Sequence, residues 1–178
     1  MNNIWHNISE ERISSEDFMA VIEIAKGSKN KYELDKETGL LMLDRILYTS
    51  THYPANYGFI PRTYGDDKDP LDVLVICAES IKPFTLVRAY PIGVIDMLDN
   101  GAHDEKIIAI PFGDPNYNMY KEIEELPQHV FQEMTHFFSV YKNLEGKDTK
   151  VEDIRGRAAA IEVITSAMEN YKKCFCGG

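Results

Sequence analysis

The feature that most constrains this chain is a fully apolar run, Val73 to Cys77, that follows directly on the acidic segment Asp66–Asp72. An apolar run of this length is typical of a buried strand. Four of the seven residues before it are aspartates, and like charges this close raise one another's pKa unless a cation joins them. The pattern therefore predicts a buried strand that begins at an acidic cluster.

The role of that cluster stays open from this segment alone. Carboxylate oxygens suit hard ions such as magnesium, manganese or calcium, but acidic turns before strands are also common as solvated turns. A calcium-binding loop that starts at Asp67 is excluded, because its sixth position requires glycine and the chain has Asp72 there. Pro70 also removes a backbone donor from such a loop.

Strand patterns dominate the chain between residue 18 and about residue 113. Turn residues separate them, and Lys36 to Gly39 and Asp99 to Gly101 each predict a hairpin. The predicted strands cover residues 21–24, 31–35, 40–43, 73–77, 87–97 and 106–110.

Helical patterns follow from about residue 117 onward. Apolar residues three and four apart predict one amphipathic helix after Pro127 and a second after Gly156. Strands followed by two helices indicate an α+β fold with a barrel-like core, and the length suits one domain over residues 1–178. The apolar faces consist of Val130, Met134, Phe137, Phe138, Tyr141 and Leu144 in the first helix, and of Ala160, Ile161, Ile164, Ala167, Met168 and Tyr171 in the second.

The composition argues against two classes of partner. A formal net charge of −10 is unfavourable for binding nucleic acid or an anionic membrane. No apolar run suits a membrane helix, and the N-terminus lacks the pattern of a signal peptide.

The chain has three cysteines, and a low, odd number argues against a disulfide framework, so we expect a cytoplasmic protein. Cys77 is expected in the core, and Cys174 and Cys176 are too few to hold zinc.

A second acidic group surrounds the predicted turn at residues 99–101. Two acidic turns at the ends of neighbouring strands can face each other and hold more than one ion. Taken singly, an aspartate such as Asp99 can also be a plain turn residue. The group consists of Asp96, Asp99, Asp104 and Glu105, and Lys106 closes it.

Cationic and aromatic residues supply the groups that a phosphate requires. A phosphate beside a metal cluster must be held by cations from several sides. Each residue alone has a simpler alternative, since Tyr141 lies on the apolar helix face and Lys142 suits a solvated helix side. The set consists of Lys31, Arg45, Tyr53, Tyr57, Tyr141 and Lys142.

The segment Asp67 to Val75 resembles the D-x-D-P-x-D-V-L-V signature of family I soluble inorganic pyrophosphatases. The resemblance extends over roughly residues 18–173 and does not depend on one motif. Further blocks similar to the family follow in the same order: Ile22–Ile24, Lys31–Glu33, Asp44–Arg45, Tyr53–Pro54, Asn56–Gly58, Gly93–Val94, His136–Phe138 and Tyr141–Lys142.

This resemblance implies a five-stranded OB-like β-barrel core with two flanking C-terminal helices. It implies hydrolysis of pyrophosphate to two orthophosphates by a metal-activated water, with roughly three to four Mg²⁺ ions per site and Mn²⁺ or Zn²⁺ as substitutes. It also implies a homo-oligomer, with a hexamer favoured over a dimer. Two departures are Ala25, where the family often has proline, and His103, where an acidic residue is common.

The resemblance also implies residue roles. Asp69 matches the carboxylate that takes the proton of the attacking water, and Glu23 and Glu33 match residues at the rim of the site. The implied metal ligands are Asp67, Asp72, Asp99 and Asp104, the phosphate-binding residues are Lys31, Arg45, Tyr57, Tyr141 and Lys142, and the supporting residues are Glu23, Glu33, Tyr53 and Lys106.

Two rival functions stay open from the residues. One is a different metal-dependent phosphohydrolase that acts on a nucleotide or phosphoester. The other is a non-enzymatic acidic module that stores calcium or binds a basic protein, and it leaves Lys31, Arg45, Tyr57 and Lys142 without a role.

Overall fold

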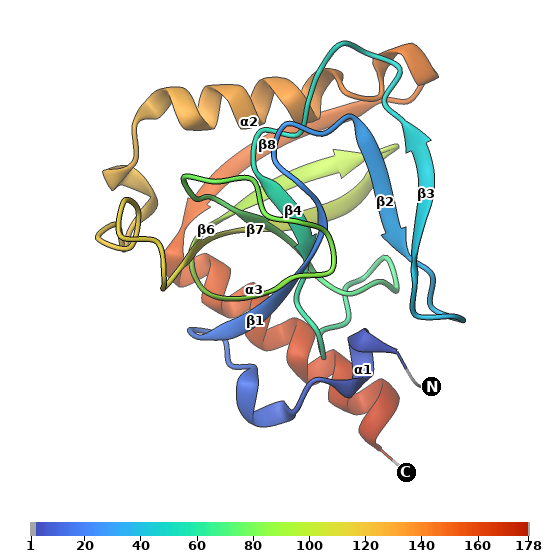
Figure 1. Cartoon of the computed structure of the whole chain (residues 1–178), viewed down its shortest axis with the longest axis vertical. Helices are drawn as coiled ribbons and strands as arrows, with labels where there is room; N and C mark the ends of the chain where they lie inside the picture. The colour runs from blue at the N-terminus through green and yellow to red at the C-terminus, as the bar shows by residue number, and fades with distance from the viewer. Residues whose placement is uncertain (1–2, 178) are drawn as a thin grey trace.

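The protein is described by a computed structural model over residues 3–177. Strands occupy the middle of the molecule, with α2 along one side and α3 along the other (Figure 1). The helices are α1 (Ile4–Asn7), α2 (Gln128–Val140) and α3 (Arg157–Tyr171). The strands are β1 (Phe18–Ile24), β2 (Asn30–Leu34), β3 (Leu41–Ile46), β4 (Asn56–Phe59), β5 (Asp72–Val75), β6 (Leu86–Asp99), β7 (Ala102–Pro111) and β8 (Thr149–Gly156).

Five of these strands close into a ring in the order β1-β4-β5-β7-β6, because β6 pairs back to β1. The β5–β7 pairing is parallel, and its neighbours in the ring are antiparallel. β6 has 14 residues, so its first residues pair with β1 and its later ones with β8. The ring and the two C-terminal helices confirm the predicted five-stranded core.

Both predicted hairpins are present. β2 and β3 form a separate two-stranded sheet beside the ring. Asn100 and Gly101 join β6 to β7 with φ values of 51° and 81°. Residues in the left-handed region give the turn a twist that matches the flanking strands, and asparagine and glycine adopt this conformation at low cost. Gly39 also has positive φ, at 75°, and closes the β2–β3 turn through a 2.8 Å bond from its N–H to Asp35 O.

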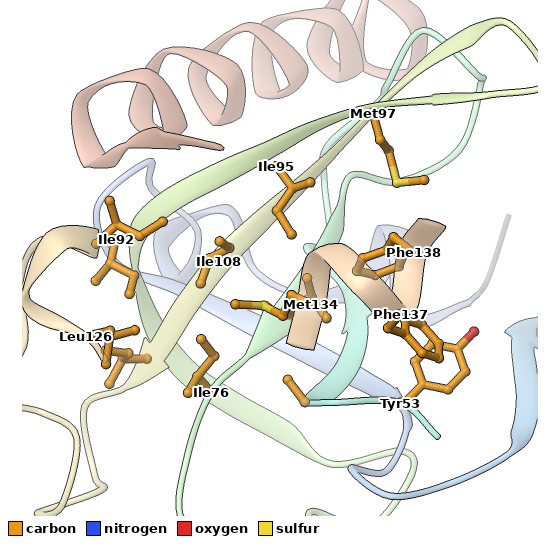
Figure 2. Packing of buried hydrophobic residues seen from close by; sticks show 14 of the residues in the cluster. Tyr53, Ile76, Ile92, Ile95, Met97, Ile108, Leu126, Met134, Phe137 and Phe138 are labelled. Carbon is orange, nitrogen blue, oxygen red and sulfur yellow. The ribbon is translucent and has the colours of Figure 1, made fainter. Parts of the chain in front are cut away.

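Helix α2 places its apolar face on the sheet as predicted. Met134, Phe137 and Phe138 are at most 2% exposed and pack against strand residues such as Ile95 and Ile108 (Figure 2). Burying side chains of this size stabilises the fold by about 1.5–3 kcal/mol each. Leu144 was expected on the same face, but it is 69% exposed. The helix ends at Val140, and Leu144 belongs to the 3₁₀ turn Asn143–Glu145 that follows.

Helix α3 covers a different part of the ring. Ala160, Ile164 and Ala167 are buried and pack in a cluster with strand residues such as Val73 and Ile107. Ile161 and Met168 of the predicted apolar face are only partly buried. Gly156 is the N-cap of this helix, which confirms the predicted boundary. Within residues 3–177, no helix is both long and apolar enough to cross a membrane.

Strand β8 was not predicted, because strands were expected to end near residue 113. It pairs with β6 at the end of the sheet, and Lys150, Glu152 and Asp153 are exposed on it. In an edge strand, charged residues occupy positions that are apolar in a buried strand, so the alternating apolar pattern is lost. The short helix α1 also lies outside every predicted element.

Candidate active site

A cavity of about 490 Å³ lies between the β2–β3 hairpin, the acidic loop before β5, and the ends of β6, β7 and α2. It collects most of the predicted site residues, which are far apart in the sequence. Of the predicted set, Arg45 and Tyr53 do not line it. The residues that do are Glu23, Lys31, Glu33, Tyr57, Asp67, Asp69, Asp72, Asp99, Asp104, Lys106, Tyr141 and Lys142.

The parallel pairing of β5 and β7 brings the two acidic turns together. Asp72 lies opposite Lys106, and Asp104 precedes Lys106 by two residues and shares its face of β7. Asp67 lies in the loop before β5. Its pKa is raised by burial and then by the nearby charge of Asp104. The expectation that the two acidic turns face each other is therefore confirmed.

Lys106 occupies the centre of this arrangement and is 2% exposed. Its ammonium donates to Tyr57 Oη at 2.9 Å, Asp72 Oδ2 at 2.8 Å and Asp104 Oδ1 at 3.1 Å. Burial alone would lower the pKa of Lys106, but Asp72 and its neighbours outweigh it and hold that pKa well above the usual range. Tyr57 Oη in turn donates to Asp72 Oδ2 at 2.5 Å. The centre is thus a charged, hydrogen-bonded group in which the cation is almost fully buried and its two aspartates are partly exposed.

The end of α2 contributes a second pair. Lys142 is 8% exposed and its ammonium pairs with Asp99 Oδ2, so the alternative of a solvated helix side is wrong. Asp99 Oδ1 is buried and has no hydrogen-bond partner among the described residues. Tyr141 is 4% exposed and stacks on Phe137 while it also lines the cavity. Its core location and its predicted site location are therefore compatible.

The β2–β3 hairpin supplies a third group of charges. Lys31 lies opposite Arg45 and pairs with Glu33 and, at 3.2 Å, with Asp44. Arg45 was expected to reach the phosphates directly, but it does not line the cavity. Its guanidinium instead pairs with Asp44 and, through Nε at 2.8 Å, with Glu145 Oε1. These carboxylates compete for the same guanidinium, which explains the difference from the expectation.

Two supporting residues lie deeper than expected. Tyr53 is 2% exposed, with its ring centroid 5.4 Å from that of Tyr57, so it backs the cavity wall. Glu23 was expected at the rim but is only 7% exposed. Its Oε1 accepts a bond from Leu34 N–H at 2.8 Å. Burial, followed by the charge of Asp72, raises the pKa of Glu23 to about 8.

Asp69 lies at the open side of the cavity, where 51% of its side chain is exposed. It pairs with Lys36, which was not predicted as a site residue although it also lines the cavity. Asp44 and Glu145 were missed as well, and they hold Arg45. Nothing in the local sequence around Lys36 marks it, because its partner is 33 residues away.

The second acidic group divides between two faces of the β6–β7 hairpin. Asp99 and Asp104 line the active-site cavity, whereas Asp96 and Glu105 pair with Arg155 of β8. Side chains alternate along a strand, so neighbours such as Asp104 and Glu105 point to opposite faces. The Arg155 side borders a cavity of about 380 Å³, which shares Asp67, Asp72 and Asp104 with the active-site cavity.

The cavity's donor set fits divalent metal ions of the hard class. Its carboxylate oxygens are the ligands that Mg²⁺ prefers, and the buried Asp99 Oδ1 is an oxygen in need of a partner. Among residues 3–177, no three His, Cys, Asp or Glu side chains converge as a ready-made metal site. The lysines account for this arrangement, since Asp69, Asp72, Asp99 and Asp104 each bond a lysine.

Sequence comparisons match this chain to inorganic pyrophosphatases. The family model described as "Inorganic pyrophosphatase" matches residues 20–172. The inorganic pyrophosphatase of Aquifex pyrophilus is 50% identical over 161 residues, which cover 89% of this chain and 91% of that protein. Soluble inorganic pyrophosphatase 1 of Arabidopsis thaliana is 47% identical over 167 residues, which cover 94% of this chain and 79% of that protein.

Solved structures agree with the sequence matches. The inorganic pyrophosphatase of Helicobacter pylori superposes with a TM-score of 0.87 at 42% identity, over 89% of this chain and 95% of that one. That of Thermus thermophilus superposes with a TM-score of 0.86 at 39% identity, over 88% of this chain and 92% of that one.

Proposed function

The chain belongs to the inorganic pyrophosphatase family, and from that premise we propose that it hydrolyses pyrophosphate in the cavity described above, with Asp69 as the general base. The reaction class itself follows from the family: this is an enzyme that hydrolyses pyrophosphate. The residue roles are the part that we propose.

The observation that carries the proposal is the Lys106 centre. A cation with 2% exposure lies between two aspartates and a tyrosine hydroxyl, at the meeting point of β5 and β7. A site that only needed stability would use apolar residues here, because buried charge carries a desolvation cost of several kcal/mol per ion. A site that must bind a highly charged anion together with cations needs fixed charges of both signs.

Asp67, Asp72, Asp99 and Asp104 would hold the divalent ions, with Mg²⁺ as the expected ion. Bound Mg²⁺ supplies neutralisation of the phosphate charge and lowers the pKa of a water molecule toward neutrality. Asp72, Asp99 and Asp104 each bond Lys106 or Lys142, so these two lysines would lie beside the ions and near the substrate.

The cationic and phenolic side chains would hold the two phosphates. Lys31, Tyr57, Tyr141 and Lys142 line the cavity from β2, β4 and the end of α2, so they can surround the anion from several directions. Arg45 can join them only after release from Asp44 and Glu145. Phosphoryl transfer depends mainly on such positioning and electrostatic stabilisation.

Asp69 would accept a proton from the attacking water. The water oxygen forms a bond to one phosphorus while the bond from that phosphorus to the bridging oxygen breaks, and the second phosphate leaves with the bridging oxygen and its electron pair. Asp69 suits this role because it borders the open side of the cavity and is half-exposed. A general base contributes about 10²–10⁴-fold to a rate.

Phosphate release from pyrophosphate by the purified chain tests the proposal. We expect rapid release with Mg²⁺, little with a chelator, and a loss of about 10²–10⁴-fold in turnover for Asp69→Asn. A panel of nucleotides and phosphoesters serves as the control for substrate class. Full turnover in Asp69→Asn would remove the role given to this residue while leaving the reaction itself in place.

The state of assembly belongs to the same proposal. We expect a homo-oligomer, with a hexamer favoured over a dimer, and His136 on the exposed side of α2 is available for such a contact. Light scattering on the eluting protein measures the mass directly, and a mass near 20.4 kDa, that of one chain, would contradict this expectation.

A further inference from the structure

Helix α1 and the segment Lys172–Cys176 lie largely outside the family match, yet they lie side by side (Figure 1). Trp5 of α1 is 3% exposed, and its ring centroid lies 5.3 Å from that of Phe175 near the C-terminus. We define the terminal aromatic cluster as Trp5, His6, Tyr64, Tyr171 and Phe175, whose rings contact one another.

Trp5 contacts two segments that lead to the cavity wall, the acidic loop and the β2–β3 turn. On one side its Nε1 donates to Thr63 O at 2.9 Å, and Thr63 Oγ1 accepts from Leu71 N–H at the end of the acidic loop. On the other side the ammonium of Lys36 lies 5.5 Å from the Trp5 ring centroid, in a cation–π arrangement. Asn3 Nδ2 also donates to Lys36 O at 2.8 Å. The N-terminal segment therefore fixes both the backbone and the charged end of Lys36.

Lys36 pairs with the Asp69 carboxylate. The backbone of Asp69 is already fixed, because its O accepts from Gly65 N–H at 2.8 Å and its N–H donates to Asp67 Oδ1 at 3.0 Å. Among residues 3–177, no other side chain bonds the Asp69 carboxylate. The orientation of this half-exposed carboxylate thus depends on Lys36.

We propose that Lys36 is a positioning residue for Asp69, held in place by the N-terminal segment through Asn3 and Trp5. The inference rests on the proposed function, in which Asp69 is the general base. A base acts only within hydrogen-bond reach of the proton that it removes, and a displacement of about 1 Å can cost about 10²-fold in rate. Phe175 packs on Trp5, which gives the C-terminal tail a part in the same support.

A double-mutant cycle tests whether Lys36 acts through Asp69. Lys36→Met keeps the alkyl stem and removes the charge, and Lys36→Arg keeps the charge. We expect Lys36→Met to lower kcat by about 10- to 100-fold with KM changed by less than about 2-fold, and Lys36→Arg to restore most of the loss. In the Asp69→Asn background, Lys36→Met should cost less than about 2-fold more. Lys82→Met, a change of an exposed lysine that lines no described cavity, is the matched control.

The single tryptophan offers a second readout that needs neither metal nor substrate. Because Lys36 lies over the Trp5 ring, Lys36→Met should change Trp5 emission and increase its quenching by acrylamide. Lys82→Met should leave both unchanged. Phe175→Ala should also lower kcat, but by a smaller factor than Lys36→Met does.

The outcomes distinguish the positioning role of Lys36 from the base role of Asp69. Equal losses from Lys36→Met in both backgrounds, or unchanged Trp5 emission in Lys36→Met, would overturn the positioning role and leave the proposed base intact. Full turnover in Asp69→Asn would overturn the base and the positioning role together. Non-additive kinetics with a matching change in emission supports the inference.

Discussion

The two faces of the β6–β7 hairpin carry similar side chains in different surroundings. On one face Lys106 lies between Asp72 and Asp104, with 3% of its side chain exposed. On the other face Arg155 pairs with Asp96 and Glu105, with 37% of its side chain exposed. Each face has one cation and two carboxylates, so composition does not distinguish them.

Burial is the difference that matters. Water screens charges near the surface, where an ion pair contributes about 0–1 kcal/mol, whereas a charge isolated from water interacts several times more strongly. The Lys106 face can therefore direct strong fields at a bound anion, while the Arg155 face mainly keeps β8 on the sheet. Matched substitutions on the two faces can break or sharpen this contrast.

The largest effect is expected from Lys106→Met. Removing one partner from a buried charge network leaves the others uncompensated, at a cost of about 3–5 kcal/mol. The free energy of unfolding should fall by this amount in urea titrations with a chelator present, and turnover should be lost. A loss below about 1 kcal/mol would show that water reaches Asp72 and Asp104 freely, and the contrast between the faces would disappear.

Asp72→Ala should have the next largest effect, on metal affinity. We expect Mg²⁺ binding measured by calorimetry to weaken by at least about 10-fold, since even outer-shell partners of a metal site are worth about 10–100-fold. Asp96→Ala, on the opposite face of the hairpin, is the control and should bind Mg²⁺ as the unchanged protein does. Equal weakening by both changes would place ions on both faces.

Burial raises the pKa of one carboxyl group near each face, Glu105 beside Arg155 and Glu23 at the cavity, and Glu23 is the more deeply buried of the two. Its pKa is raised from 4.5 to about 8, chiefly by burial, so between these values the folded chain keeps a proton that the unfolded chain releases. Stability from this group is present below pH 4.5 and is lost as the pH rises toward 8, with a slope of at most about 1.4 kcal/mol per pH unit.

Glu23→Gln should remove that slope. With a chelator present, the variant should gain stability relative to the unchanged protein as the pH rises from 5 to 9, and urea titrations at several pH values measure the difference. Parallel pH profiles would mean that Glu23 is ionised in the folded chain at neutral pH.

The sequence predicted most of the ring, because its signals are local. Asn100 and Gly101 define their own turn, and the apolar run at Val73 has the length of a buried strand. β8 was missed since its exposed charges hide the alternation of a strand. The segment that carries Arg155 was therefore absent from the expected fold.

The site was predicted less evenly. Resemblance to the family assigned Asp67, Asp69 and Asp72 to the site, and all three line the cavity. Local pattern cannot predict the pairs Lys36–Asp69, Lys106–Asp72 and Lys142–Asp99, because they join residues 33 to 43 positions apart. For the same reason no local pattern marked Lys36 or Glu145 as part of the site. Without knowledge of the Glu145 pair, Arg45 was expected in the cavity wall.

The smallest effect is expected from Arg155→Met. Its two ion pairs are partly exposed, so their loss should lower the free energy of unfolding by less than about 1 kcal/mol, and pyrophosphate turnover should stay within about 2-fold. Salt should reduce even this difference, because mobile ions weaken ion pairs that are exposed to solvent. A large loss of turnover without a loss of stability would mean that the Arg155 face takes part in the reaction, since only a wall of side chains such as Asp72 and Asp104, common to both cavities, separates it from Lys106.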